Sequence, residues 1–420
     1  MNDSDFPPGF LWGASTSGHQ TEGNNIASDW WAQEAAMPDE GRSGDACDSF
    51  HRYDEDMRLL AAAGLSSYRF GIEWSRIEPR QGMISRAGLA HYRRMIDTAL
   101  ELGLVPVVTL HHFTSPQWFA QAGGWMHPDA VSWFAAYIET VSTILDGVEW
   151  VVTINEPNML AMMVTIRELL GDPEKAAQWH SPTVENGVAQ EMLPLPNERV
   201  SDRLIDAHRA AVATLRSRTT AQVGWSVANR ALDARPGAEA RLEEVRYVWE
   251  DRFLEVSRDD DFVGVQSYSA AWVNQLGVEA TEPSPDNTLA GVAYRPDALG
   301  IAVRHTAEVT GGVPILVTEN GIATHDDARR IAYTEEALRH LASSVREGVD
   351  VRGYLHWSLL DNYEWGHWGP TFGLIAVDRA TFARTPKPSL AWLGEVAARG
   401  GSHFRDEGGA SGTLIKGATR

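Results

Sequence analysis

Eight short apolar runs alternate with amphipathic segments along most of this chain of 420 residues. Short apolar runs are typical of buried parallel strands, and apolar residues at helical spacing indicate helices that cover them. The expected strands are 10–15, 66–72, 104–110, 150–155, 222–228, 262–268, 315–319 and 353–357. The expected helices are 53–63, 87–102, 128–145, 202–216, 239–253, 334–347 and 389–398. This alternation predicts an α/β fold, a single (β/α)8 TIM barrel over residues 1–400.

Three other segments differ from this alternation. Residues 401–420 are rich in Gly and show little periodicity, so we expect a flexible tail. Residues 159–198 begin as a helix to about Gly171 and continue as coil with several prolines, and we expect them to overhang the mouth of the barrel. The first residues carry no basic stretch ahead of an apolar one, and no run approaches 18 apolar residues, so no targeting or membrane-spanning segment is expected.

Net charge and cysteine content limit the binding partners and metal sites that this chain can have. Lys and Arg number 36 and Asp and Glu number 57, which gives a net charge of −21. Such a charge opposes binding to nucleic acid or to anionic membranes. Cys47 is the only cysteine, which excludes an intramolecular disulfide and a cysteine-based metal site and favours a cytoplasmic enzyme. We expect a small-molecule substrate, and the sequence leaves open whether the chain forms homo-oligomers.

Two of the apolar runs end in a carboxylate. The run 151–154 leads through Asn155 to Glu156, and Pro157 ends the strand because it cannot donate to a ladder. A second run, starting at residue 315, ends at Glu319. A single glutamate at a strand end is often only a turn residue. Because the carboxyl ends of barrel strands meet at one face, however, we expect Glu156 and Glu319 to share one site.

Other polar and aromatic residues follow the ends of different strands. They are Gln20, Arg69, His111, His112, Asn155, Tyr268 and Trp357. A single buried Arg, His or Tyr is more often a satisfied core group than a ligand. Their joint placement at one end of the barrel favours a functional site.

Paired carboxylates without a metal-ligand set suit the cleavage of a glycosidic bond. One donates a proton to the leaving oxygen, and the other attacks the sugar or activates water. A separation of about 5–5.5 Å leads to retention of configuration and about 6.5–9.5 Å to inversion, and the sequence gives no distance. Hydrogen bonds to sugar hydroxyls could come from Gln20, His112, Asn155 and Glu364, and flat faces from Trp357 and Trp365.

Other chemistries lack their motifs. The neighbouring His111 and His112 project in different directions, which argues against a zinc site. No Gly-rich phosphate loop and no G-x-S-x-G motif occur, so neither a nucleotide cofactor nor a serine triad is expected. We therefore predict an enzyme that needs no cofactor and no metal.

Six motifs occur in the order of one known family. They are residues 6–13 with Gln20 and Glu22, then 68–79, 109–113, 153–157, 318–321 and 357–365. The chain resembles glycoside hydrolase family 1, the family of retaining β-glucosidases and β-galactosidases. The resemblance implies that Glu156 is the general acid/base and Glu319 the nucleophile.

The resemblance also implies roles for the surrounding residues. Asn155 holds the 2-hydroxyl of the sugar, and Arg69 and Tyr268 support the carboxylate of the nucleophile. The non-reducing sugar is held by Gln20, His112, Glu364 and Trp365, with Trp357 as its floor and Phe372 at its rim.

The expected function is that of an exo-acting, retaining β-glycosidase, most specifically a β-glucosidase. Glu364 would repel a phosphate, which favours unphosphorylated glucosides or a close epimer. The alternatives are a transglycosidase and a sugar-binding relic of the fold. The family usually has Asn-Tyr-Tyr where this chain has Gln266, Ser267 and Tyr268, and often an aromatic residue at the place of Asn158. These departures fall on the leaving-group side.

Overall fold

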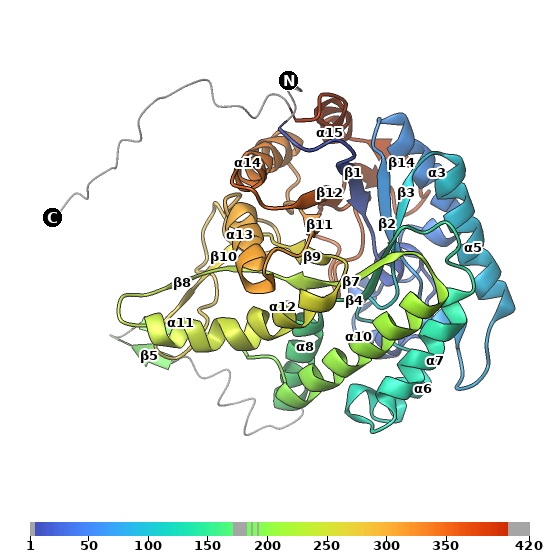
Figure 1. Cartoon of the computed structure of the whole chain (residues 1–420), viewed down its shortest axis with the longest axis horizontal. Helices are drawn as coiled ribbons and strands as arrows, with labels where there is room; N and C mark the ends of the chain where they lie inside the picture. The colour runs from blue at the N-terminus through green and yellow to red at the C-terminus, as the bar shows by residue number, and fades with distance from the viewer. Residues whose placement is uncertain (1–4, 171–182, 186–187, 191–192, 402–420) are drawn as a thin grey trace.

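Eight parallel strands close into a barrel in the computed structural model, which describes residues 5–170, 183–185, 188–190 and 193–401 (Figure 1). Around the barrel the strand order is β1-β12-β11-β9-β7-β4-β3-β2. The strands are β1 (Leu11–Ser15), β2 (Ser67–Gly71), β3 (Val105–Thr109), β4 (Trp150–Asn155), β7 (Gln222–Ala228), β9 (Val263–Gln266), β11 (Ile315–Asn320) and β12 (Val351–Trp357). Each coincides with an expected strand, and the predicted (β/α)8 barrel is confirmed.

Helices surround the barrel and cover its outer face (Figure 1). The longer ones are α3 (Ser49–Ala62), α5 (Arg86–Glu101), α7 (Ala130–Ser142), α8 (Pro157–Leu170), α10 (Glu198–Arg218), α13 (Ala298–Thr310), α14 (Asp327–Arg346) and α15 (Pro388–Ala398). Shorter ones are α1 (Gly18–Thr21), α2 (Asp29–Glu34), α4 (Trp74–Ile77), α6 (Gln117–Gln121), α11 (Glu239–Arg246) and α12 (Arg252–Val256). Among the described residues, no helix is long and apolar enough to cross a membrane.

Three small two-stranded sheets lie outside the barrel. They are β5 (Thr183–Glu185) with β6 (Val188–Gln190), β8 (Ala231–Ala234) with β10 (Ala270–Val273), and β13 (Ile375–Val377) with β14 (Arg384–Pro386). The tail expected at 401–420 lies outside the described residues except for Gly401. So do 171–182, 186–187 and 191–192 of the segment expected to overhang the barrel, whose first part forms α8.

Several helical features differ from expectation. Helix α13 and the short helices α1, α2, α4 and α6 have no counterpart among the expected helices. Gly300 and several β-branched residues give α13 a low helix propensity. The helix ends where Gly311 adopts a left-handed conformation with φ +76°, which favours glycine. The expected helix at 239–253 is interrupted by a π-helical turn at Tyr247–Asp251, which separates α11 from α12.

The barrel separates two apolar layers. Leu11 on β1, Val152 on β4 and Leu316 on β11 belong to one cluster, and because these strands lie on different sides of the barrel, the cluster fills its interior. Alternate residues, such as Val151 and Val317, pack outward in the larger cluster that joins the barrel to its helices.

The alternation breaks at the ends of the two strands that carry the glutamates. With Leu316 inside the barrel, strict alternation would turn Glu319 outward toward the helices. Instead, the strand register shifts between Val317 and Glu319, and a similar shift occurs on β4 between Val152 and Asn155. Such irregularities change the direction of a side chain. Both Asn155 and Glu319 line the cavity at the end of the barrel.

Candidate active site

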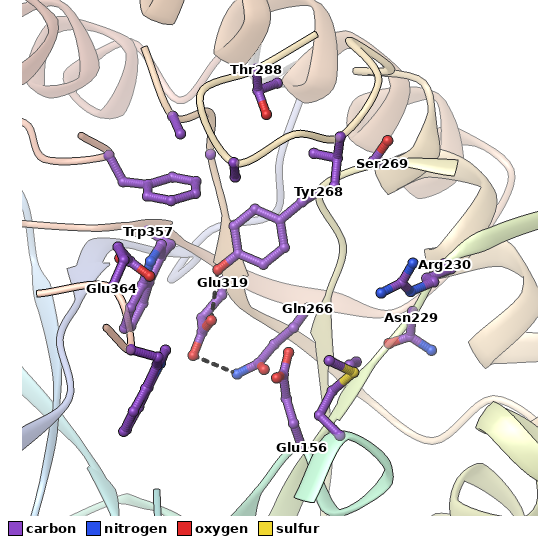
Figure 2. Close-up of a pocket in the computed structure, with 18 of the residues that line it drawn as sticks. Glu156, Asn229, Arg230, Gln266, Tyr268, Ser269, Thr288, Glu319, Trp357 and Glu364 are labelled. Carbon is purple, nitrogen blue, oxygen red and sulfur yellow. Dashed lines mark hydrogen bonds between the residues drawn. The ribbon is translucent and has the colours of Figure 1, made fainter. Parts of the chain in front are cut away.

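A cavity of ≈ 410 Å³ opens at the carboxyl ends of the barrel strands (Figure 2). Ten of the residues singled out in the sequence line it, namely Gln20, His112, Asn155, Glu156, Tyr268, Glu319, Trp357, Glu364, Trp365 and Phe372. Arg69 lies directly behind its wall and is fully buried. The structure therefore brings together the residues that the strand-end rule selected, with one exception.

That exception is His111, which does not line the cavity. Its Nε2 lies 3.0 Å from Oγ of Ser115, and burial lowers the pKa of the imidazole to about 3. His111 is thus a neutral core residue. Within the described ranges, no group of three or more His, Cys, Asp or Glu side chains has an arrangement that could hold a metal ion.

Glu319 is held by three donors. Nη1 of Arg69 donates to Oε1 at 2.6 Å, and Nε2 of Gln266 donates to the same oxygen at 2.8 Å. The hydroxyl of Tyr268 donates to Oε2 at 2.6 Å. Burial raises the pKa of Glu319, and the charge and hydrogen bonds of these neighbours oppose that rise.

Glu156 has no comparable support. It follows β4 with a left-handed φ of 44°, an uncommon conformation for a non-glycine residue, and its backbone N–H donates to the carbonyl of Ser226 at 2.7 Å. Its carboxyl group accepts no hydrogen bond from another described residue. Burial first, and then the charge of Glu319, raise the pKa of Glu156 well above its usual value.

The two carboxyl groups therefore differ in protonation. Both lie toward the same part of the cavity (Figure 2). Because Glu319 has a cation and two neutral donors while Glu156 has none, Glu319 ionises first and its charge helps Glu156 to keep a proton. An ionised carboxylate beside a protonated one provides a nucleophile and a general acid in one cavity.

Asn155 is oriented by the same network. Its Oδ1 accepts from Nη2 of Arg69 at 2.5 Å and from Nε2 of Gln266 at 2.7 Å. Its Nδ2 lies 3.3 Å from Nε2 of His112. Its orientation is consequently set by residues of β2 and β9 and by His112, which follows β3.

One side of the cavity, the Glu364 side, is formed by Glu364 with the residues that contact it or stack beside it, namely Gln20, His112, Trp357 and Trp365. The imidazole of His112 lies nearly parallel to Trp357 and Trp365, at 5.9 and 6.3 Å between ring centroids. Nδ2 of Asn362 donates to Oε1 of Glu364 at 3.2 Å. Burial raises the pKa of Glu364 to about 8. Polar groups beside flat aromatic faces suit a sugar ring.

The opposite side, the Arg230 side, was largely missed from the sequence. It contains Met159, Met162 and Met163 of α8 together with Asn229 and Arg230, which follow β7. In Figure 2, Arg230 and Asn229 lie across Glu156 and Glu319 from Glu364 and Trp357. The position of Arg230 just after a barrel strand was a usable signal, because the same rule selected the other site residues.

The chain is similar to known enzymes over nearly its whole length. The model of glycosyl hydrolase family 1 matches residues 2–180 and 248–402. Thermostable β-glucosidase B of Thermobispora bispora is 30% identical, over 95% of this chain and 92% of the relative.

Solved structures of β-glucosidases are similar to this chain in fold and in sequence. β-Glucosidase 1317 superposes with a TM-score of 0.81 at 40% identity, covering 93% of this chain and 98% of that one. β-Glucosidase from Thermotoga maritima in complex with deoxynojirimycin gives a TM-score of 0.81 at 27% identity, covering 95% and 99%. With the family match spanning most of the chain and the cavity at the expected end of the barrel, this protein is a glycoside hydrolase and belongs to glycosyl hydrolase family 1.

Proposed function

We propose that this enzyme is an exo-acting, retaining β-glucosidase that hydrolyses unphosphorylated β-glucosides. The observation that carries the proposal is the unequal support of the two carboxyl groups, since three donors hold Glu319 and none holds Glu156. The names of the relatives support the choice of sugar, and one of their structures contains deoxynojirimycin.

The reaction follows from these two groups. Glu319 attacks the anomeric carbon while Glu156 gives its proton to the leaving oxygen, and a covalent glycosyl-enzyme forms. The ester at Glu319 carries no charge, so the pKa of Glu156 falls and its carboxylate accepts a proton from water. Water then attacks the anomeric carbon from the face that the leaving group occupied. Two inversions give net retention.

The sugar takes the Glu364 side of the cavity. Asn155 binds the 2-hydroxyl, and Arg69 and Tyr268 fix the nucleophile. Hydrogen bonds to the other hydroxyls come from Gln20, His112 and Glu364. The ring lies on Trp357, with Trp365 beside it and Phe372 at the rim. A phosphate next to Glu364 would meet a carboxyl group, and the one cation among the described lining residues, Arg230, lies on the opposite side of the cavity (Figure 2).

Product stereochemistry tests the proposal. Aryl β-glucosides and their β-galactoside epimers are compared for turnover, and proton NMR then follows the first minutes of glucoside hydrolysis. β-Glucose should appear before mutarotation produces the α anomer. Initial release of α-glucose, or failure of all aryl β-glycosides to react, would refute the proposed function.

Transfer to an alcohol is a second candidate activity, because Met159, Met162 and Met163 give the Arg230 side an apolar wall that suits an acceptor other than water. Added alcohols should then appear as alkyl β-glucosides among the products. The complete set of donors around Glu319 speaks against a sugar-binding relic of the fold.

Three further expectations stay predictions, and self-association stays open. The expectations are a cytoplasmic location, a single domain over residues 1–400 and a flexible tail at 401–420. Gel filtration of the full chain tests self-association, and limited proteolysis tests the division between barrel and tail.

A further inference from the structure

The Arg230 side of the cavity contains a cation whose guanidinium makes no direct ion pair with a described residue, although the carboxyl groups of Glu250 and Glu156 attract its charge. Arg230 lines the cavity, and its guanidinium lies over the ring of Trp249 at 5.2 Å from the centroid. Its backbone N–H donates to Oε1 of Glu250 at 2.7 Å. Its guanidinium, however, makes no ion pair and no hydrogen bond with any residue that the structure describes.

This situation differs from that of the other arginine at the site. Arg69 is paired with Glu319 at 2.6 Å and bonded to Asn155, so its charge is compensated. The described residues that line the cavity include three carboxyl groups, Glu156, Glu319 and Glu364, and a single cation, Arg230. A guanidinium held away from water is costly unless a partner satisfies its donors, so a partner from the ligand would gain more here than at the surface.

Two polar atoms of the cavity lining are also unsatisfied. Asn229 and Thr288 line the cavity and are at least nine-tenths buried, at 2% and 7% exposure. Oδ1 of Asn229 and Oγ1 of Thr288 have no hydrogen-bond partner within the described part of the chain. Asn229 lies beside Arg230, whereas Thr288 lies apart from them, beyond Tyr268 (Figure 2). The Arg230 side therefore offers polar groups to a polar ligand, and the fork of Arg230 fits a carboxylate with two parallel hydrogen bonds.

The remaining wall is apolar and adaptable. Met159 and Met162 belong to a cluster with Trp249, the ring beneath Arg230, and Met163 lines the cavity beside them. Methionine side chains adjust to irregular or aromatic ligands. An apolar body with an anionic end therefore matches this side better than a second neutral sugar.

We propose that Arg230 selects β-glucosides whose leaving group is an apolar, aromatic alcohol that carries a carboxylate. The inference rests on the proposed function, because it assigns the sugar to the Glu364 side and the leaving group to the Arg230 side. The carboxylate pairs with the guanidinium while the aromatic body packs against the methionines. Arg230 is thus a specificity residue, and it takes no part in bond making.

Arg230 also influences Glu156, whose pKa its charge lowers. That effect is the same for two substrates whose leaving groups have equal acidity. Two substrates that differ only in a charge remote from the scissile bond therefore distinguish this effect on Glu156 from selection of the leaving group by Arg230.

The test uses phenyl β-glucosides with a 2-carboxyethyl chain at the meta or para position and the primary amides of the same compounds. The short alkyl chain keeps the phenol leaving groups nearly equal in acidity. The ratio of kcat/KM for acid over amide is measured for the wild type, Arg230→Gln and Arg230→Lys. Arg379→Gln is the matched control, since Arg379 is exposed, lies over Trp368 and does not line this cavity.

The wild-type ratio should be about 10 or more, as for a charge-assisted, paired contact. It should fall to near 1 in Arg230→Gln, recover in part in Arg230→Lys and stay unchanged in Arg379→Gln. A wild-type ratio near 1 in both positional series, or a ratio that Arg230→Gln leaves unchanged, would overturn the inference. The comparison of acid and amide in the wild type is valid whether or not the variants fold.

Binding separates this inference from the proposed function. If neither member of a pair is hydrolysed, the proposed function fails, and calorimetry on the same compounds still reports on Arg230. Tighter binding of the acid by about ten-fold, lost in Arg230→Gln, would support recognition of the carboxylate, and equal affinities would contradict it.

Discussion

The side-chain amide of Gln266 donates a hydrogen bond to Oε1 of Glu319 at 2.8 Å. The same nitrogen lies 2.7 Å from Oδ1 of Asn155, so a residue at the end of β9 joins β11 to β4 across the site. The family resemblance leads one to expect Asn at this place. The longer side chain of Gln266 reaches both partners and is part of the hydrogen-bond network around Glu319.

Replacing Gln266 with Leu should lower kcat by about 10- to 100-fold, the value of one hydrogen bond to a charged group. Loss of this donor removes an interaction that lowers the pKa of Glu319, so the acid limb of the kcat/KM profile should move to higher pH. The measurement is the full pH profile on an aryl β-glucoside. Gln266→Asn, which keeps the amide but shortens it, is the control. An unmoved acid limb in Gln266→Leu would show that the contact does not tune Glu319.

Glu319→Ala should lower kcat by several orders of magnitude, because no group remains to form the glycosyl-enzyme. Azide can enter the space left by the carboxylate and attack the anomeric carbon once. The product should be the α-glucosyl azide, with inverted configuration, as seen by proton NMR. Glu243→Ala, at an exposed position where the side chain bonds to none of the described residues, should behave as wild type. Full activity without azide would remove Glu319 from the mechanism.

Glu156→Gln should affect substrates according to their leaving groups. An activated nitrophenolate departs without a proton, whereas an alkyl alcohol needs one, so kcat/KM should fall far more for the alkyl glucoside. The slope of log kcat/KM against leaving-group pKa measures this difference. An equal loss for all leaving groups would contradict the role of Glu156 as general acid.

Parts of this site follow from local sequence. The run 151–154 predicts a strand, because burial on both faces demands a continuous apolar stretch. The proline after Glu156 predicts that this strand ends at Glu156. The run that precedes Glu319 gave the second carboxylate in the same way. The strand-end rule then placed both glutamates at one mouth of the barrel, as the structure shows.

Other parts depend on tertiary contacts. The register shift between Val317 and Glu319 turns the side chain of Glu319 inward, yet period-two alternation alone would have turned it outward. Helix α13 contains Gly300 and β-branched residues, and its stability comes from packing on α14 and β9 rather than from propensity. The proposed role of Arg230 depends on its guanidinium having no described side-chain partner. This is visible only in the folded structure, because no local sequence pattern shows it.

The charge on Glu319 should set the proton affinity of its neighbour. Glu319 raises the pKa of Glu156, so Glu319→Gln, which removes the charge with little change of shape, should lower the pKa of Glu156. Carbon-13 NMR of labelled glutamate, compared with Glu156→Gln to identify the signal, measures this titration. A Glu156 pKa that is the same in wild type and Glu319→Gln would mean that the carboxyl groups do not interact. The proposed change of Glu156 from proton donor to proton acceptor would then have no electrostatic explanation.

Stability should depend on pH through Glu364. Burial raises the pKa of this carboxyl group to about 8 in the folded protein, against about 4.3 for an unfolded chain. Between these values the folded state holds a proton that the unfolded state has released, so the contribution of Glu364 to stability falls as the pH rises. Glu364→Gln cannot ionise, and its Tm should exceed that of the wild type by more at pH 8 than at pH 5. Glu243→Gln, at an exposed position, should show no such trend. A Tm difference between Glu364→Gln and the wild type that stays constant from pH 5 to pH 8 would mean that Glu364 ionises as readily in the cavity as in water. The empty site would then already contain an ionised carboxylate that repels a phosphate.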